Sequence, residues 1–132
     1  EKRIETHQKN RPAHWQTMEE PLHLGDLLMA QASEQKLILV DCLTLWLTNL
    51  LLHHDATLLQ KEQEALLLAV ERLPGSLILV NNENGLGIIP MGELTRRFVD
   101  ANGILNQQLT QRCPRVTWVV AGLPLFLKGS DG

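Results

Sequence analysis

The sequence predicts an α/β domain in which helices cover both faces of a mostly parallel sheet. Three short apolar runs are continuous rather than alternating, which is typical of strands buried on both faces. Segments in which apolar residues recur at helical spacing separate these runs. Because strands and helices alternate along the chain, crossover connections and parallel pairing are expected. The three expected strands are Leu37–Val40, Leu77–Val80 and Val116–Val120.

Four segments are expected to form helices. The first, Leu22–Ala32, leads into the first strand, and the second, Leu43–His54, follows that strand directly. The third, Thr57–Leu73, carries an apolar stripe and ends at a Pro-Gly pair, which stops helices. The fourth, Glu93–Arg112, has apolar residues spaced by three and four, although its internal Asn102-Gly103 pair disfavours a helix locally.

Length and composition restrict the class of protein. The 132 residues suit a single domain spanning residues 1–132, and 44% hydrophobic with 20% charged residues favours a packed core over disorder. The net charge of −3 disfavours a nucleic-acid partner. Only two cysteines, Cys42 and Cys113, are present, which excludes a disulfide framework and fits a reducing compartment. Since no apolar run reaches the roughly 18–20 residues of a membrane span, a cytoplasmic location is predicted.

Acidic side chains follow two of the expected strands. Asp41 comes directly after the first strand, and Glu83 follows the second by two residues. Ligands of open parallel sheets bind beyond the carboxyl ends of the strands, where a carboxylate can hold Mg²⁺ against nucleotide phosphates. The alternative is that these acids only cap helices or accept from loop amides.

A glycine-rich segment at residues 84–90 follows Glu83. Its amides could approach an anion closely, although a plain turn explains the same composition. The segment matches neither G-x-G-x-x-G nor the phosphate-binding G-x-x-x-x-G-K-[ST] pattern, and the 132 residues contain no match to the latter.

His7 lies in a polar segment with several cations. A histidine in such a segment is most often only solvated. Arg3, Lys9 and Arg11 nevertheless stand close in sequence and could neutralise phosphates, Arg11 bidentately. A neutral imidazole beside bound phosphates is a competent nucleophile toward phosphorus.

Other reactive or aromatic residues are given structural roles. Trp46 and Trp118 lie in apolar segments and are expected in the core, and Cys42 is expected to be an inert buried thiol. The remaining histidines are not spaced with acids or cysteines as a metal site requires, and two of them mark a helix end. They are His14, His23, His53 and His54.

Three motifs, in this order, resemble one enzyme family. They are R-P-x-H-W at Arg11–Trp15, T-N-L-L at Thr48–Leu51 and N-E-x-G-x-G-I-x-P at Asn82–Pro90. Together with the fourth helix and the Trp118–Gly122 strand, they resemble the bifunctional adenosylcobinamide kinases / adenosylcobinamide-phosphate guanylyltransferases of cobalamin biosynthesis. The resemblance covers nearly the whole chain.

The resemblance implies a P-loop NTPase-like, RecA-like fold and two reactions. The first phosphorylates adenosylcobinamide with a nucleoside triphosphate. The second transfers GMP from GTP to adenosylcobinamide phosphate through a guanylyl-histidine intermediate and yields adenosylcobinamide-GDP. ATP and GTP as substrates, Mg²⁺ as cofactor, a corrinoid substrate and a homotrimer follow from the same resemblance.

The resemblance also assigns site residues. His7 would carry the guanylyl group, and Arg11 would clamp its phosphates. Asp41 stands where relatives often carry Glu and would contact GTP or, with Glu83, a Mg²⁺–phosphate site. The remaining expected GTP contacts are Gln8, Lys9, Asn10 and Glu19.

One part of the family pattern is not found in these residues. The family begins with a strand, a G-x-x-x-S-G-K-S-type loop and a helix, whereas this sequence starts at Glu1 just ahead of the His7 motif. We therefore expect the first strand and P-loop, and with them a competent triphosphate site, to be absent from this chain. Taken alone, the chain is expected to lose the kinase step and to be impaired in guanylyl transfer, and one flank of its sheet is expected to be open and apolar. The alternatives are a non-catalytic P-loop-like nucleotide-binding or interaction module, and a different nucleotide kinase, which would lack the His7–Trp15 block.

Overall fold

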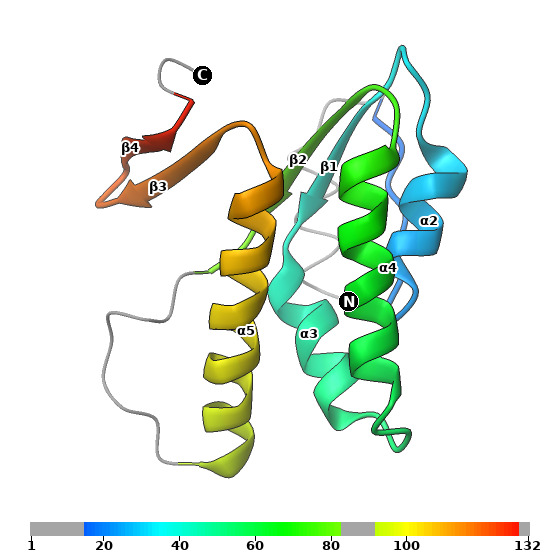
Figure 1. The fold of residues 1–132 in the computed structure, drawn as a ribbon, viewed down its shortest axis with the longest axis vertical. Helices are drawn as coiled ribbons and strands as arrows, with labels where there is room; N and C mark the ends of the chain where they lie inside the picture. The colour runs from blue at the N-terminus through cyan, green and yellow to red at the C-terminus, as the bar shows by residue number, and fades with distance from the viewer. Residues whose placement is uncertain (1–14, 83–91, 130–132) are drawn as a thin grey trace.

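The computed structural model describes residues 15–82 and 92–129. All four expected helices and all three expected strands are confirmed, with ends that shift by no more than two residues. The C-terminal strand β4 was not expected. The elements, shown in Figure 1, are α2 (Leu24–Gln31), β1 (Leu37–Asp41), α3 (Leu43–Leu52), α4 (Leu58–Arg72), β2 (Ser76–Val80), α5 (Glu93–Arg112), β3 (Val116–Val120) and β4 (Leu123–Lys128).

Parallel pairing is confirmed for the first two strands. Leu37 of β1 lies opposite Ser76 of β2, and Asp41 lies opposite Val80, so the carboxyl ends of both strands meet at one edge. The connection between them runs through α3 and α4, as parallel pairing requires.

The third strand pairs differently from the prediction. Within the described residues β3 forms an antiparallel hairpin with β4 and is not hydrogen-bonded to β1 or β2. Ala121 and Gly122 make the two-residue turn with positive φ angles of 51° and 78°, as tight hairpins require. Lys128 is the last residue of β4.

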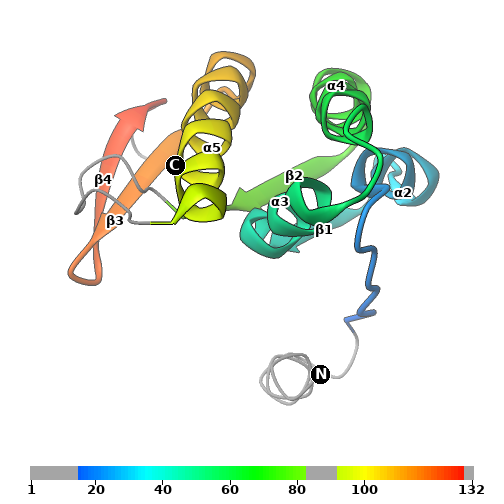
Figure 2. The same ribbon diagram turned by 90° about the horizontal axis from the view of Figure 1, so that it is seen from below.

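The strands β1 and β2 are buried on one face only, which corrects the prediction of burial on both. Ile38, Val40, Leu77 and Leu79 pack against the core, whereas the alternate residues of both strands are exposed. Figure 2 shows the reason, because α4 and α5 lie on the same side of this sheet. A continuous apolar run specifies a strand but not how many faces are covered. The exposed apolar residues are Leu37, Leu39, Ile78 and Val80.

The core forms where α4 packs against α2, α3 and α5. Leu43 and Leu47 of α3, Leu66 of α4 and Leu105 of α5 are fully buried. Trp46 is buried as predicted, and its indole Nε1 donates to the carbonyl of Leu22 at 2.8 Å. Trp118 and Cys42 are only half-buried, so the expectation of a core position is not met in full for either residue.

Local turn and helix signals have mixed outcomes. The Pro-Gly pair ends α4 as expected, and Gly75 adopts a φ of +83°, where a β-carbon would clash with the carbonyl oxygens of Ser33 and Lys36. His53 is the C-cap of α3, as the helix-end interpretation predicted. In contrast, α5 continues without a break through Asn102 and Gly103, because Asn102 is held by tertiary hydrogen bonds described below.

Candidate functional site at the carboxyl edge of the parallel strands

The edge where β1 and β2 end collects polar side chains from three elements. Asp41 is the exposed last residue of β1, and Asn81 and Asn82 follow β2 at the same edge because the two strands are parallel and in register. The helix α3 starts two residues after Asp41, so the first turn of α3 lies at this edge as well. Asp41 thus lies at the end of its strand as predicted, whereas Glu83, the second strand-end acid, lies outside the described residues.

An asparagine network holds the chain directly after β2. The amide Nδ2 of Asn81 donates to Oδ1 of Asn102 at 2.7 Å and to Oδ1 of Asn106 at 2.9 Å. Asn102 and Asn106 return hydrogen bonds to the carbonyl of Asn82 at 2.8 and 3.2 Å. Since Asn102 is only 1% exposed, these bonds replace the hydrogen bonds to water that its side-chain amide loses on burial. The network fixes the backbone of Asn82, directly after β2.

The network continues into α3. Asn82 Nδ2 donates to the hydroxyl of Thr44 at 3.0 Å, and the Thr48 hydroxyl donates to the Thr44 carbonyl at 2.9 Å. Beside these two threonines, a hollow of about 240 Å³ lies between α3 and the first turns of α5. Three threonine hydroxyl groups and an apolar wall suit a ligand with one polar and one apolar side. The hollow is lined by Thr44, Thr48, Leu51, Leu94, Thr95 and Phe98.

The T-N-L-L motif has a physical explanation in this arrangement. Thr48 lines the hollow, whereas Asn49 donates from Nδ2 to the carbonyl of Pro21 at 3.2 Å. Leu50 and Leu51 are buried in the core. The motif therefore anchors the segment before α2 onto α3 and supplies one wall of the hollow.

Glu20 shapes the entrance to α2. Its carboxylate accepts hydrogen bonds from the backbone amides of His23 and Leu22 at 3.0 and 3.1 Å, and these bonds hold the pKa of Glu20 below its usual value. The neighbouring Glu19, an expected GTP contact, is exposed on this segment. Glu20 thus holds the turn of Leu22 and His23 that leads into α2.

The other expected site residues lie outside the described residues. One group is the expected nucleophile with the expected GTP contacts next to it. The other is the second strand-end acid with the glycine-rich segment that follows it. They are His7, Gln8, Lys9, Asn10, Arg11 and Glu83 with residues 84–90.

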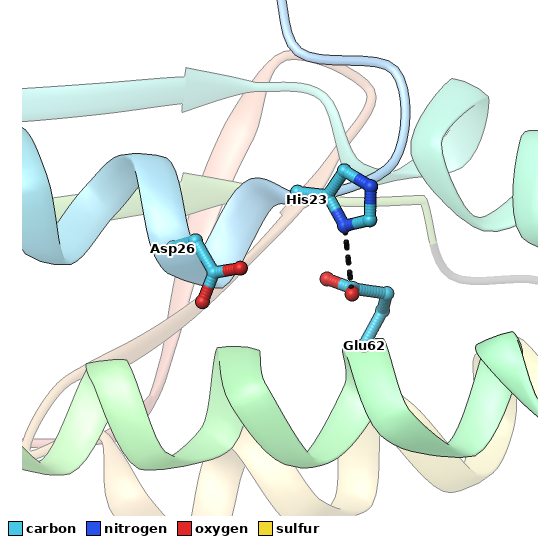
Figure 3. Close-up of side chains that lie close together, drawn as sticks. All are labelled: His23, Asp26 and Glu62. Carbon is cyan, nitrogen blue, oxygen red and sulfur yellow. Dashed lines mark hydrogen bonds and ion pairs between the residues drawn. The ribbon is translucent and has the colours of Figure 1, made fainter.

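A second cluster was missed by sequence reasoning. His23 and Asp26 of the α2 region and Glu62 of α4 each place one potential ligand atom within 4.8 Å of the others (Figure 3). The interpretation that His23 is not spaced with acids as a metal site requires did not allow for Glu62, which is 39 residues away in sequence and reaches His23 only through helix packing. The spacing of His23 and Asp26, three residues apart at a helix start, was the one local signal.

These observations first define a class of protein. An α/β domain with polar side chains gathered at the carboxyl ends of parallel strands has the architecture in which small-molecule ligands bind at that edge. The family model for cobinamide kinase / cobinamide phosphate guanyltransferase matches residues 1–127 of the chain. The chain belongs to this family, which confirms the resemblance seen in its motifs.

Individual relatives agree with the family match. The chain is 56% identical over 128 residues to the bifunctional adenosylcobalamin biosynthesis protein CobP of Pseudomonas aeruginosa, covering 97% of this chain and 74% of that protein. It is 34% identical over 139 residues to CobU of Escherichia coli, covering 96% of this chain and 77% of that protein. CobU of Salmonella typhimurium is 35% identical over the same length, with the same coverage. Among the described helices, none is long and apolar enough to cross a membrane.

Proposed function

We propose that this chain acts in cobalamin biosynthesis, where it transfers GMP from GTP to adenosylcobinamide phosphate and takes part in the phosphorylation of adenosylcobinamide by ATP or GTP. The family match over residues 1–127 is the observation that carries this proposal. The geometry supports it, since Asp41, the asparagine network and the hollow beside Thr44 and Thr48 form one ligand-binding edge.

His7 is the proposed nucleophile. Its neutral imidazole attacks the α-phosphorus of GTP, an N–P bond forms, and the bond to the leaving pyrophosphate breaks. A phosphate oxygen of adenosylcobinamide phosphate then attacks the same phosphorus, which releases His7 and yields adenosylcobinamide-GDP. Arg11 is proposed to hold the phosphates bidentately during both displacements. Gln8, Lys9 and Asn10 adjoin these residues in sequence and are proposed to contact GTP, as is Glu19.

Asp41 fits a role at a Mg²⁺ ion. Its carboxylate is exposed at the strand edge, and carboxylate oxygen is the ligand that Mg²⁺ prefers in proteins. Glu83 is proposed as the second acid of this site. When bound, Mg²⁺ would neutralise charge that develops on the leaving pyrophosphate.

Intact-mass spectrometry after incubation with GTP and Mg²⁺ tests the nucleophile. The unaltered chain is expected to gain one GMP through an acid-labile bond, as phosphoramidates show, and H7A is expected to gain none. H54A is the matched control, since His54 is exposed at the end of α3, and it should label normally. Labelling of H7A would assign the nucleophile elsewhere, and GTP binding without labelling of the unaltered chain would favour a non-catalytic nucleotide-binding module.

A second pair of variants tests the edge. D41N is expected to slow guanylylation by about 10- to 100-fold, with partial recovery at higher Mg²⁺ concentration, as weakening of a metal site does. E34Q removes an exposed carboxylate that precedes β1, at the opposite end of the strand, and should have no effect. Equal rates for D41N and E34Q would remove Asp41 from the proposed site.

The kinase reaction is tested separately. The 132 residues contain no G-x-x-x-x-G-K-[ST] element, and we propose that they do not phosphorylate adenosylcobinamide by themselves. Phosphate transfer from ATP to adenosylcobinamide by the 132 residues alone would refute this. We also propose a cytoplasmic homotrimer, for which light scattering should give three times 14.9 kDa. A measured mass of one chain would refute the proposed trimer without affecting the labelling result.

A further inference from the structure

A histidine and two carboxylates converge where α2 packs on α4. His23 Nδ1 lies 2.9 Å from Glu62 Oε2, and a carboxylate oxygen of Asp26 completes a group whose ligand atoms all lie within 4.8 Å (Figure 3). The cluster belongs to neither the strand edge nor the hollow beside α5. It therefore needs an explanation of its own.

Glu62 is the unusual member of the group. Glu62 is only 6% exposed, and its second carboxylate oxygen, Oε1, is buried without a hydrogen-bond partner. In Figure 3 the carboxylate of Glu62 points into the space between His23 and Asp26. A buried carboxylate oxygen without a partner costs free energy, so an additional ligand at this position would be stabilising.

The two helices hold the cluster rigidly. Gly25 lies between His23 and Asp26 in sequence, and a β-carbon at this position would come within 2.6 Å of the Ala65 carbonyl carbon. Ala65 lies one helical turn after Glu62, so this close approach of the two helices adjoins the cluster. A site on packed helices loses little entropy when it binds an ion, because its side chains are already placed.

The donor set indicates which kind of ion fits. One imidazole nitrogen with two carboxylate oxygens suits a borderline transition metal such as Zn²⁺, whereas Mg²⁺ prefers oxygen ligands alone. His23 and Asp26 are exposed, which leaves room for a water ligand and an entry path. We propose that His23, Asp26 and Glu62 form a divalent transition-metal site that joins α2 to α4.

The metal would replace the proton that His23 shares with Glu62. The hydrogen bond that His23 donates to the carboxylate of Glu62, together with the nearby charges of Glu62, Glu20 and Asp26, raises the pKa of His23 above its usual value. Metal and proton therefore compete for Nδ1, and binding is best measured at a pH above that pKa.

Titration of the full chain with Zn²⁺ alone, after EDTA treatment, tests the proposal by calorimetry. One equivalent should bind, Tm should rise, and Mg²⁺ at the same concentration should give neither effect. Co²⁺ should give the visible absorption of a low-coordinate site. H23A, D26N and E62Q should each bind Zn²⁺ at least about tenfold more weakly.

Controls separate this site from adventitious binding. E64Q removes an exposed carboxylate from the same helix, and H54A removes an exposed histidine elsewhere, so both should bind Zn²⁺ normally. Far-UV circular dichroism confirms that E62Q, which preserves the side-chain shape, is folded. Absence of Zn²⁺ binding, or binding that persists in all three cluster variants, would overturn the proposal and leave a hydrated ion pair. The guanylylation assay uses Mg²⁺ and GTP, so its outcome is independent of this one.

Discussion

Replacing Gly25 with alanine tests whether packing or helix propensity controls the junction of α2 and α4. Gly25 lies in the first turn of α2, where alanine would favour the helix by up to about 1 kcal/mol. The added β-carbon, however, would meet three backbone atoms of α4, at 2.6 and 2.7 Å from the carbonyl carbon and oxygen of Ala65 and at 2.8 Å from the nitrogen of Leu66. The two effects have opposite signs.

The distances decide which effect is larger. Ordinary contact starts near 3.4 Å, so the helices would have to separate by about 0.8 Å. A gap of this size removes a quarter to a half of the dispersion energy of each contact across the junction. Since backbone atoms cannot move aside as a rotamer can, we expect an overpacking cost of about 3 kcal/mol and a net loss of about 2 kcal/mol.

Urea unfolding followed by tryptophan fluorescence and circular dichroism measures this loss. Trp46 is a suitable probe because it is buried against the segment that leads into α2. G103A is the matched control, since a β-carbon at Gly103 in the middle of α5 meets nothing within 4 Å. G103A should gain about 0.5–1 kcal/mol. Stabilisation of G25A by a similar amount would refute the packing argument.

Three further predictions concern the core, the asparagine network and the helix junction. L66A should lower the free energy of unfolding by about 2–5 kcal/mol, whereas L68A, on the exposed side of the same helix, should change it by less than about 0.5 kcal/mol, both measured in urea. N102A leaves buried partners of the network unsatisfied and should cost about 1–3 kcal/mol by the same measurement; a neutral effect would mean that water replaces the amide. His23 has a raised pKa in the folded state, so its bond to Glu62 stabilises the protein fully below the unfolded-state value of 6.5 and loses this effect as the pH rises through the folded-state pKa. With EDTA present, H23A should therefore cost less than about 1 kcal/mol near pH 6 and almost nothing near pH 9, and the opposite trend would contradict the assignment.

The helices and strands were predictable because their signals are local. Apolar spacing by three and four identified Glu93–Arg112 with the ends that the structure has. The Asn102-Gly103 pair suggested a local weakness in that helix, which the structure does not show. Asn102 tolerates the helix because its side chain bonds to residues that follow β2, a contact 20 residues away. No local rule contains that information.

The strand β4 was missed for a related reason. It contains Pro124, and proline within an apolar run argues against a strand. In the structure Pro124 lies opposite Val119, and β4 has one strand partner within the described part of the chain. Proline is tolerated on such a strand because an edge strand is hydrogen-bonded along one side only. Which strand becomes an edge is decided by the whole sheet.

The site shows the same division. Because parallel strands in register end together, Asp41 could be placed at the ligand edge from sequence alone. The asparagine network could not, since three of its members, Asn81, Asn102 and Asn106, are polar residues without a distinctive spacing. The contact between His23 and Glu62 depends on the angle and distance at which α2 and α4 pack, which 39 residues of intervening chain do not reveal.

The sequence by itself determined the order of the elements, the family and the residues proposed to carry the guanylyl transfer, because periodicity and short motifs are written along the chain. Only the tertiary structure decided which strand faces stay exposed, how α5 holds the chain after β2, and where His23 meets Glu62. These features depend on distances between segments far apart in sequence. Side-chain packing sets such distances, and no stretch of the sequence records them locally.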